Sequence, residues 1–228
     1  MNRLFDFNNP AWQFLAKIVD AIVLHVCWLV CSLPLITIAA SSGALYQTLM
    51  NDINDEGGYY VREYFRAFKK NFKPGLPLSL VLIAFVGVLG LSLYALSTFE
   101  PTPMWAAIRG FDLLAGALLV MMLPYLFTLF GFFYSTTGNL IQTSFFLSIK
   151  HIGRTLLMLL IPVLMLALIE TFNFYALLVP GFGLVAYLDC HILRPIIRPW
   201  IRKARGEPEE EEEKPAQPRR RRGRGPEV

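Results

Sequence analysis

Long apolar segments are the feature that most constrains the fold of this chain. Hydrophobic residues make up 55% of its 228 residues, which is more than a soluble domain of this size usually carries. The hydrocarbon core of a bilayer is about 30 Å thick and takes about 20 apolar residues per helix, and a helix satisfies its own backbone hydrogen bonds in lipid. The sequence therefore predicts an all-α, polytopic transmembrane helix bundle with about five spans, at residues 10–40, 76–97, 111–134, 155–169 and 174–188. Either of the last two is short enough to be a re-entrant helix instead.

Two short stretches of the chain are closely similar. Residues 41–48 have the sequence SSGALYQT and residues 136–143 have the sequence TTGNLIQT. Each follows one apolar segment and is separated from the next by an aromatic and basic stretch. Internal repeats of this kind are typical of transporter-like membrane folds. We expect two parallel helical-hairpin repeats plus a fifth helix, with Gly43 and Gly138 in matching turns; chance similarity between two loops is the alternative.

Lysine and arginine cluster after the first, third and fifth predicted spans. Because cytoplasmic loops are enriched in these residues, we expect a multi-pass membrane protein with its N-terminus outside and its C-terminus cytoplasmic. Pro34 is expected to kink the far end of the first span. A cleaved signal peptide is the alternative for that span, but its apolar run is longer than a typical signal sequence.

The segment 41–75 is predicted to be an amphipathic cytoplasmic loop. Its second half alternates aromatic and basic side chains, which is typical of a helix lying on a membrane surface. Two roles fit this pattern: plain anchoring to lipid, and docking of a cytoplasmic partner. The candidate partner or lipid surface consists of Tyr60, Arg62, Tyr64, Arg66, Lys69, Lys70 and Lys73.

The end of the chain differs in composition from the rest. An acidic run at 209–213 is followed by a basic run at 219–222, and both lie among proline and glycine. Such a segment has too little apolar surface to order itself, and runs of like charge are usually solvated. We therefore expect a transmembrane helical domain at 1–205 and a disordered charged tail at 206–228.

Motifs that carry catalysis are missing from the sequence. It contains no Walker A loop, no Gly-x-Ser-x-Gly and no His-Glu-x-x-His. Cys27, Cys31 and Cys190 lie in or beside apolar segments, and no second His or Cys pair joins them, so a metal site is not expected. We predict no catalytic, cofactor-binding or metal-binding residues, no cofactor, and no enzymatic activity.

One ionisable residue is expected well inside the membrane. His25 lies in the first apolar segment, and Trp28 and Ser32 follow it on the same helix face. Ionisable side chains within membrane spans are costly and often functional, so these three residues form a candidate intramembrane polar site. A neutral histidine hydrogen-bonded between helices and a proton relay or sugar-contacting site are the two interpretations.

Several short motifs together resemble a known family. The chain is similar to the YesL-like family of bacterial membrane proteins in Leu4-Phe5-Asp6, Asn9-Pro10, Trp28-Leu29, Ser32-Leu33-Pro34, Thr37-Ile38, Ala44-Leu45-Tyr46, Ala67-Phe68-Lys69 and Asn71-Phe72. The resemblance is dense over residues 4–73. His25 and Ala39 depart from the asparagine and glycine expected there. The resemblance implies a bacterial inner-membrane protein of unestablished activity with a link to carbohydrate uptake, and it supplies no catalytic residues.

Three functions are compatible with these features. The first is a non-enzymatic accessory or regulatory membrane protein linked to carbohydrate (oligosaccharide) ABC-type uptake. The second is a transporter or permease subunit for a small sugar-like solute, favoured by the repeat and by proline-interrupted helices. A membrane enzyme ranks last. The expected partners are the lipid bilayer and sugar ABC transporter subunits; no nucleic-acid partner is expected, and the sequence does not specify the oligomeric state.

Overall fold

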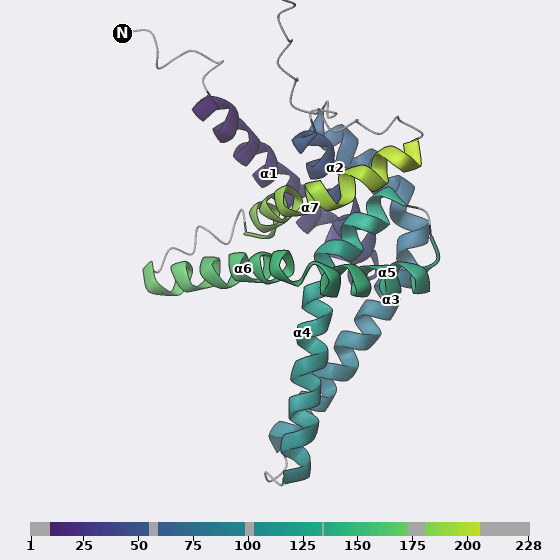
Figure 1. Cartoon of the computed structure of the whole chain (residues 1–228), viewed down its shortest axis with the longest axis vertical. Coiled ribbons are helices and arrows are strands. Elements are labelled where there is room, and N and C mark those ends of the chain that lie inside the picture. The colour runs from purple at the N-terminus through teal and green to yellow at the C-terminus, as the bar shows by residue number, and fades with distance from the viewer. Residues whose placement is uncertain (1–9, 55–58, 99–102, 134, 173–180, 206–228) are drawn as a thin grey trace, which may run out of the picture. The chain divides into compact units, whose positions relative to one another are not determined.

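The protein is helical throughout the part of the chain that the structure describes. The computed structural model describes residues 10–54, 59–98, 103–133, 135–172 and 181–205, and no strand occurs among them. The helices are α1 (Pro10–Ser32), the short 3-10 helix η1 (Leu35–Thr37), α2 (Ile38–Ile53), α3 (Tyr60–Thr98), α4 (Pro103–Phe132), α5 (Thr137–Lys150), α6 (Ile152–Phe172) and α7 (Gly181–Arg205) (Figure 1). The predicted all-α, membrane-type helix bundle is thereby confirmed.

Three helices are long and apolar enough to cross a membrane. They are α3, residues 104–132 of α4 and residues 152–171 of α6, and the apolar part of α1 is shorter. The predicted spans at 76–97 and 155–169 fall within α3 and α6, and the span predicted at 111–134 overlaps α4 as far as Phe132. The chain divides into two units, residues 1–194 and 195–228, and the contacts described below belong to the first.

The first predicted span is in fact two helices. Pro34 ends α1 instead of merely kinking it, and the Thr37 hydroxyl ties the turn by donating to the carbonyl oxygens of Cys31 (2.6 Å) and Pro34 (2.7 Å). The chain then doubles back, because Trp28 on α1 bonds Ser42 on α2. α1 and α2 therefore form a hairpin, which removes the single crossing expected over residues 10–40.

The helix α2 is the centre of the core, whereas the sequence predicted this segment to be part of an amphipathic cytoplasmic loop on the membrane surface. From Ala39 to Ile53 every side chain except Gln47 is buried. Small residues allow this: a Cβ atom added to Gly75 on α3 would lie 2.9 Å from the Cβ of Ala40, and one added to Gly131 on α4 would lie 2.6 Å from the carbonyl oxygen of Gly43. Close approach at small residues is the usual way in which membrane helices pack.

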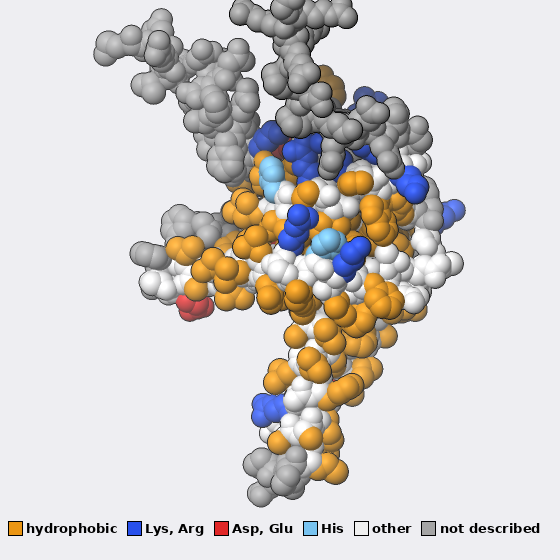
Figure 2. Space-filling model, in the orientation of Figure 1, with side chains coloured by type: hydrophobic (Ala, Val, Ile, Leu, Met, Phe, Trp, Pro, Cys, Tyr) orange, Lys and Arg blue, Asp and Glu red, His pale blue; other side chains and the backbone are white. Residues whose placement is uncertain are grey.

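The helix α3 has two parts with different surroundings. Its first part contacts α2 through a buried stripe at helical spacing: Tyr64, Ala67, Asn71, Gly75 and Leu78. Beyond Pro74 and Pro77 it continues as an apolar helix and lies beside α4 (Figure 1). Figure 2 shows hydrophobic side chains covering this pair and α6, and Leu91 on α3 is 76% exposed. An apolar surface of this extent fits contact with lipid.

The repeat is visible in the order of the helices but not in the predicted turns. A long, a short and a long helix follow one another twice, as α1–α2–α3 and as α4–α5–α6. Gly43 and Gly138 lie within α2 and α5, so neither forms a turn. A Cβ atom on Gly43 would lie 2.5 Å from the ring of Phe130, whereas nothing lies within 4 Å of one on Gly138. The two positions are thus packed differently, and the superposition of the repeats stays a prediction.

The last predicted span and the tail are only partly described. Of the span expected at 174–188, residues 181–188 form the start of α7, which is not among the apolar helices long enough to cross a membrane. The expected disordered tail at 206–228 lies outside the described residues.

Candidate functional site

The predicted intramembrane residues form one polar cluster at the contact of α1 with α2 and α7. His25 is 4% exposed and accepts a hydrogen bond at Nδ1 from the backbone N–H of Gly183 (3.1 Å). Trp28 donates from Nε1 to the Ser42 hydroxyl (3.0 Å), and Ser32 donates to the Ser41 hydroxyl (2.9 Å). The structure therefore brings His25, Trp28 and Ser32 together.

The polar side chains of this cluster are already hydrogen-bonded to other groups of the protein. The imidazole of His25 stacks on Trp28, with ring centroids 5.5 Å apart, and Trp28 stacks on Phe182 at 4.4 Å. A Cβ atom at Gly183 would lie 2.6 Å from the carbonyl oxygen of Ala21 and from the Cβ of His25, so α7 approaches α1 closely here. This arrangement fits the structural interpretation of His25, because a sugar or a proton carrier would have to displace bonds that hold three helices together.

The predicted partner surface lies on the first part of α3, and the structure removes one of its predicted residues, Tyr64. Tyr64 does not belong to it: its side chain is fully buried, its hydroxyl lies 2.9 Å from that of Ser41, and its ring stacks on Phe68. The basic side chains are exposed, and Tyr60 is half-buried. Four of these basic side chains recur at helical spacing and define what we call the basic stripe: Arg62, Arg66, Lys69 and Lys73.

Aromatic and apolar side chains border the basic stripe. Val61 and Phe65 are each 40% exposed, and Phe72 is 38% exposed. Lys70 is also exposed, on a neighbouring position of the helix. This face of α3 combines cations with apolar area, as either a membrane surface or a protein partner requires.

A buried carboxyl group, which the sequence predicted to lie at the edge of a membrane helix, forms a second site. Asp189 on α7 is 2% exposed, and its Oδ2 accepts a hydrogen bond from the Tyr46 hydroxyl on α2 (3.0 Å). Its Oδ1 is buried and has no hydrogen-bond partner among the described residues. α7 is not one of the membrane-spanning helices, and burial raises the pKa of Asp189 to about 7, against the smaller opposing effect of the Tyr46 hydrogen bond.

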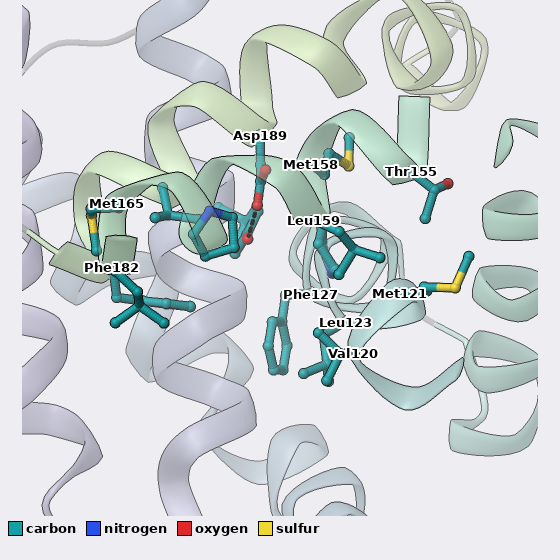
Figure 3. Close-up of a pocket in the computed structure, with 15 residues that line it drawn as sticks. Val120, Met121, Leu123, Phe127, Thr155, Met158, Leu159, Met165, Phe182 and Asp189 are labelled. Carbon is teal, nitrogen blue, oxygen red and sulfur yellow. Dashed lines mark hydrogen bonds between the residues drawn. The ribbon is translucent and has the colours of Figure 1, made fainter. Parts of the chain in front are cut away.

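Asp189 lies in the wall of an apolar cavity of about 310 Å³ (Figure 3). The cavity is bounded by residues of α2, α4, α6 and α7, and three of its side chains are methionines: Met121, Met158 and Met165. Thr155 also lines it, but its hydroxyl already donates to the carbonyl oxygen of Ser148 (2.8 Å). The site pairs a large apolar volume with one unsatisfied carboxyl oxygen.

A second apolar cavity, of about 480 Å³, lies between α3, α4 and α5. It also holds one carboxyl group, that of Asp112, whose Oδ2 accepts a hydrogen bond from the Ser92 hydroxyl. The Asp112 carboxyl is thus tied to the neighbouring helix, which holds α3 and α4 together along their apolar parts.

The cysteines lie in two places. Cys27 and Cys31 are half-buried on α1, and Cys190 is buried on α7. No group of three or more His, Cys, Asp or Glu side chains that could hold a metal ion occurs within residues 10–54, 59–98, 103–133, 135–172 and 181–205.

Comparison with known proteins adds one match. A family model described as "Protein of unknown function, DUF624" matches residues 21–93, which is less than half of the chain and runs from α1 into the apolar part of α3. No curated protein and no solved structure matches the chain. The chain is thus similar to a family whose description states no activity.

Proposed function

We propose that this protein is a non-enzymatic accessory or regulatory protein of the bacterial cytoplasmic membrane, linked to carbohydrate (oligosaccharide) ABC-type uptake. The observation that carries the proposal is the basic stripe. Four exposed cations stand on one face of α3, next to partly exposed apolar side chains, and the opposite face of the same helix is anchored in the core. A rigidly held surface of this kind suits a protein partner better than a loop would, because little conformational entropy is lost on binding. The link to carbohydrate uptake rests on the YesL-like resemblance.

The close packing of the interior favours a role in binding a partner over a role in conducting a solute. The helices around α2 approach closely at Gly43, Gly75, Gly131 and Gly183. The polar side chains of α1 are bonded to α2 and α7. A passage for a sugar needs polar groups that are free to replace its water shell, whereas these groups bind one another.

The hairpin of α1 and α2 suggests an orientation different from the one predicted. Asp20 on α1 lies within electrostatic reach of Asp52 near the end of α2, and Arg194 donates to Asn54 (3.0 Å). The early part of α1 therefore lies on the side from which the basic part of α3 begins. By the enrichment of cations in cytoplasmic loops, we place this side in the cytoplasm, with the early part of α1 inside instead of outside.

A transporter or permease subunit is the second candidate, and the order of the helices favours it. A long, a short and a long helix follow one another twice, and repeated helix units of this kind are typical of transporters. Flux of a sugar through liposomes that contain this chain alone would favour this candidate over an accessory role.

Charge reversal on the basic stripe tests the accessory role. We expect Arg62→Glu with Arg66→Glu to reduce recovery of transporter subunits in a pull-down from native membranes by about tenfold or more, since like charges across an interface are repelled. The matched control is Lys150→Glu with Arg154→Glu, which reverses two exposed cations at the corresponding place in the second helix series. Membrane abundance of both variants is measured first, so that the comparison is made at equal protein.

Two results would contradict the proposal. Equal recovery of partners by both double variants would leave the basic stripe with lipid anchoring only. A cysteine placed at position 62 that reacts with a membrane-impermeant reagent in intact cells would contradict the cytoplasmic placement of this surface.

A further inference from the structure

The carboxyl group of Asp189 is unusual in the wall of an otherwise apolar cavity. The other polar side chains in the wall are already engaged: the Tyr46 hydroxyl donates to Asp189 itself, and the Thr155 hydroxyl bonds the carbonyl oxygen of Ser148 and the hydroxyl of Tyr125. Asp189 Oδ1 alone is buried without a hydrogen-bond partner among the described residues. An unsatisfied buried acceptor is costly, and a ligand that donates a hydrogen bond there would remove this cost.

The remainder of the wall selects for an apolar body. Leucine, valine, proline, phenylalanine and methionine side chains make up most of the lining. Methionines adapt to ligands of irregular shape. The rings of Tyr46 and Phe182, whose centroids lie 6.4 Å apart, add aromatic surface to the lining.

We propose that this cavity binds a small apolar molecule with a protonated primary amine, whose ammonium group pairs with the carboxylate of Asp189. A sugar does not fit, because its several hydroxyl groups would meet one free acceptor and an apolar wall. A carboxylate does not fit, because it would oppose the charge of Asp189. The proposal is independent of the accessory role, since it concerns the purified chain without any partner.

Binding of an amine changes the protonation of the site. Burial raises the pKa of the Asp189 carboxyl to about 7, and a bound ammonium group lowers it again. Tyr46, Tyr125 and Cys190 are the other titratable groups within electrostatic reach of Asp189. Burial raises the pKa of Tyr46 and of Cys190 well above their usual values, so Asp189 is the group that releases a proton.

The test uses the full chain in lipid nanodiscs and three probes of one shape. They are 1-aminoadamantane, 1-adamantanol and 1-adamantanecarboxylate, and their binding is measured by equilibrium dialysis against empty nanodiscs. We expect saturable binding of the amine, at least tenfold weaker binding in Asp189→Asn, and unchanged binding in Asp112→Asn, which alters the carboxyl group of the other cavity. The alcohol and the carboxylate should bind the wild-type chain at least tenfold more weakly than the amine.

Calorimetry on the wild-type chain provides a measurement that needs no variant. In buffers of different ionisation enthalpy, amine binding should release close to one proton at pH 6 and almost none at pH 9. The proposal is overturned if the amine does not bind saturably, if the alcohol binds equally well, if Asp189→Asn leaves amine binding unchanged, or if no proton is released at pH 6.

Discussion

Replacing Gly75 by alanine tests the packing of α2 against α3 directly. A Cβ atom at this position would lie 2.9 Å from the Cβ, 3.0 Å from the backbone nitrogen and 3.1 Å from the Cα of Ala40. Optimal separations between carbon atoms are about 3.5–4.0 Å. Two of the three opposing atoms belong to the backbone of α2, so no side-chain rotation relieves the contact, and the two helices must move apart.

The size of the effect follows from two opposing contributions. Overpacking of a filled core costs about 1–3 kcal/mol, while glycine to alanine in a helix interior gains about 1 kcal/mol. Gly87 provides the matched control because it lies in the same helix and nothing lies within 4 Å of a Cβ atom added there. The helix contribution largely cancels between the two variants, so Gly75→Ala should be less stable than Gly87→Ala by about 1–3 kcal/mol.

The free energy of unfolding is measured in mixed micelles, by titration with a denaturing detergent and circular dichroism. Gly87→Ala should be as stable as the wild-type chain or more stable, and Gly75→Ala should be the least stable of the three. Equal stability of the two variants would refute the close approach of α2 and α3. It would also leave the many small residues of α2 without a structural explanation.

Two further outcomes are expected from the same assay. Gly43→Ala should destabilise the protein by about 1–3 kcal/mol, because it displaces the buried ring of Phe130, whereas Gly138→Ala should change the stability little; equal effects would contradict the different packing of the two repeat motifs. Since burial raises the pKa of Asp189 to about 7 in the folded protein, its contribution to stability is fully present below about pH 4 and is lost as the pH rises to about 7. Asp189→Asn should remove this loss, which is on the order of a few kcal/mol, and an unchanged difference between pH 5 and pH 8 would show that Asp189 is not buried as described.

Length and apolar composition were sufficient to predict the three spanning helices. The predictions at 76–97, 111–134 and 155–169 succeeded because those segments face a uniform apolar surrounding, which requires about 20 apolar residues whatever the tertiary contacts are. The helices themselves extend further: α3 begins at Tyr60 and α4 at Pro103. The extra turns carry polar residues, so hydropathy did not join them to the spans, although alternating aromatic and basic residues predicted a helix in the first part of α3.

The burial of α2 was missed for the opposite reason. Its buried residues include Ser41, Ser42, Thr48, Asn51 and Asp52, which are polar and therefore resemble a solvent-exposed surface. A helix surrounded by other helices does not need an apolar sequence, provided that its polar groups are bonded: Thr48 donates to the carbonyl oxygen of Ala44, and Ser42 accepts a hydrogen bond from Trp28. Pro34 was recognised as a break, but the sequence does not show whether the chain continues or reverses after it.

The cavity site could not have been predicted from spacing. Tyr46 and Asp189 are 143 positions apart, and no periodicity connects them. Tyr46 belongs to the repeat motif, but the second copy has isoleucine at the corresponding position, Ile141. The tyrosine is thus a difference between the two copies, and a difference of this kind was the available signal that the first copy has a polar task the second lacks.

The two proposals rest on different neighbours of α2. Tyr46 bonds Asp189 at the cavity, while the adjacent Gln47 lies within 3.4 Å of Asn71 on the buried stripe of α3. The basic stripe occupies other positions of α3 and does not contribute to the lining of the cavity. Asp189→Asn therefore leaves the cations of α3 in place, and reversal of Arg62 and Arg66 leaves the carboxyl group in place. Loss of amine binding with retained partner recovery, or the reverse, would thus assign each property to its own surface, whereas loss of both in either variant would indicate disruption of α2 itself.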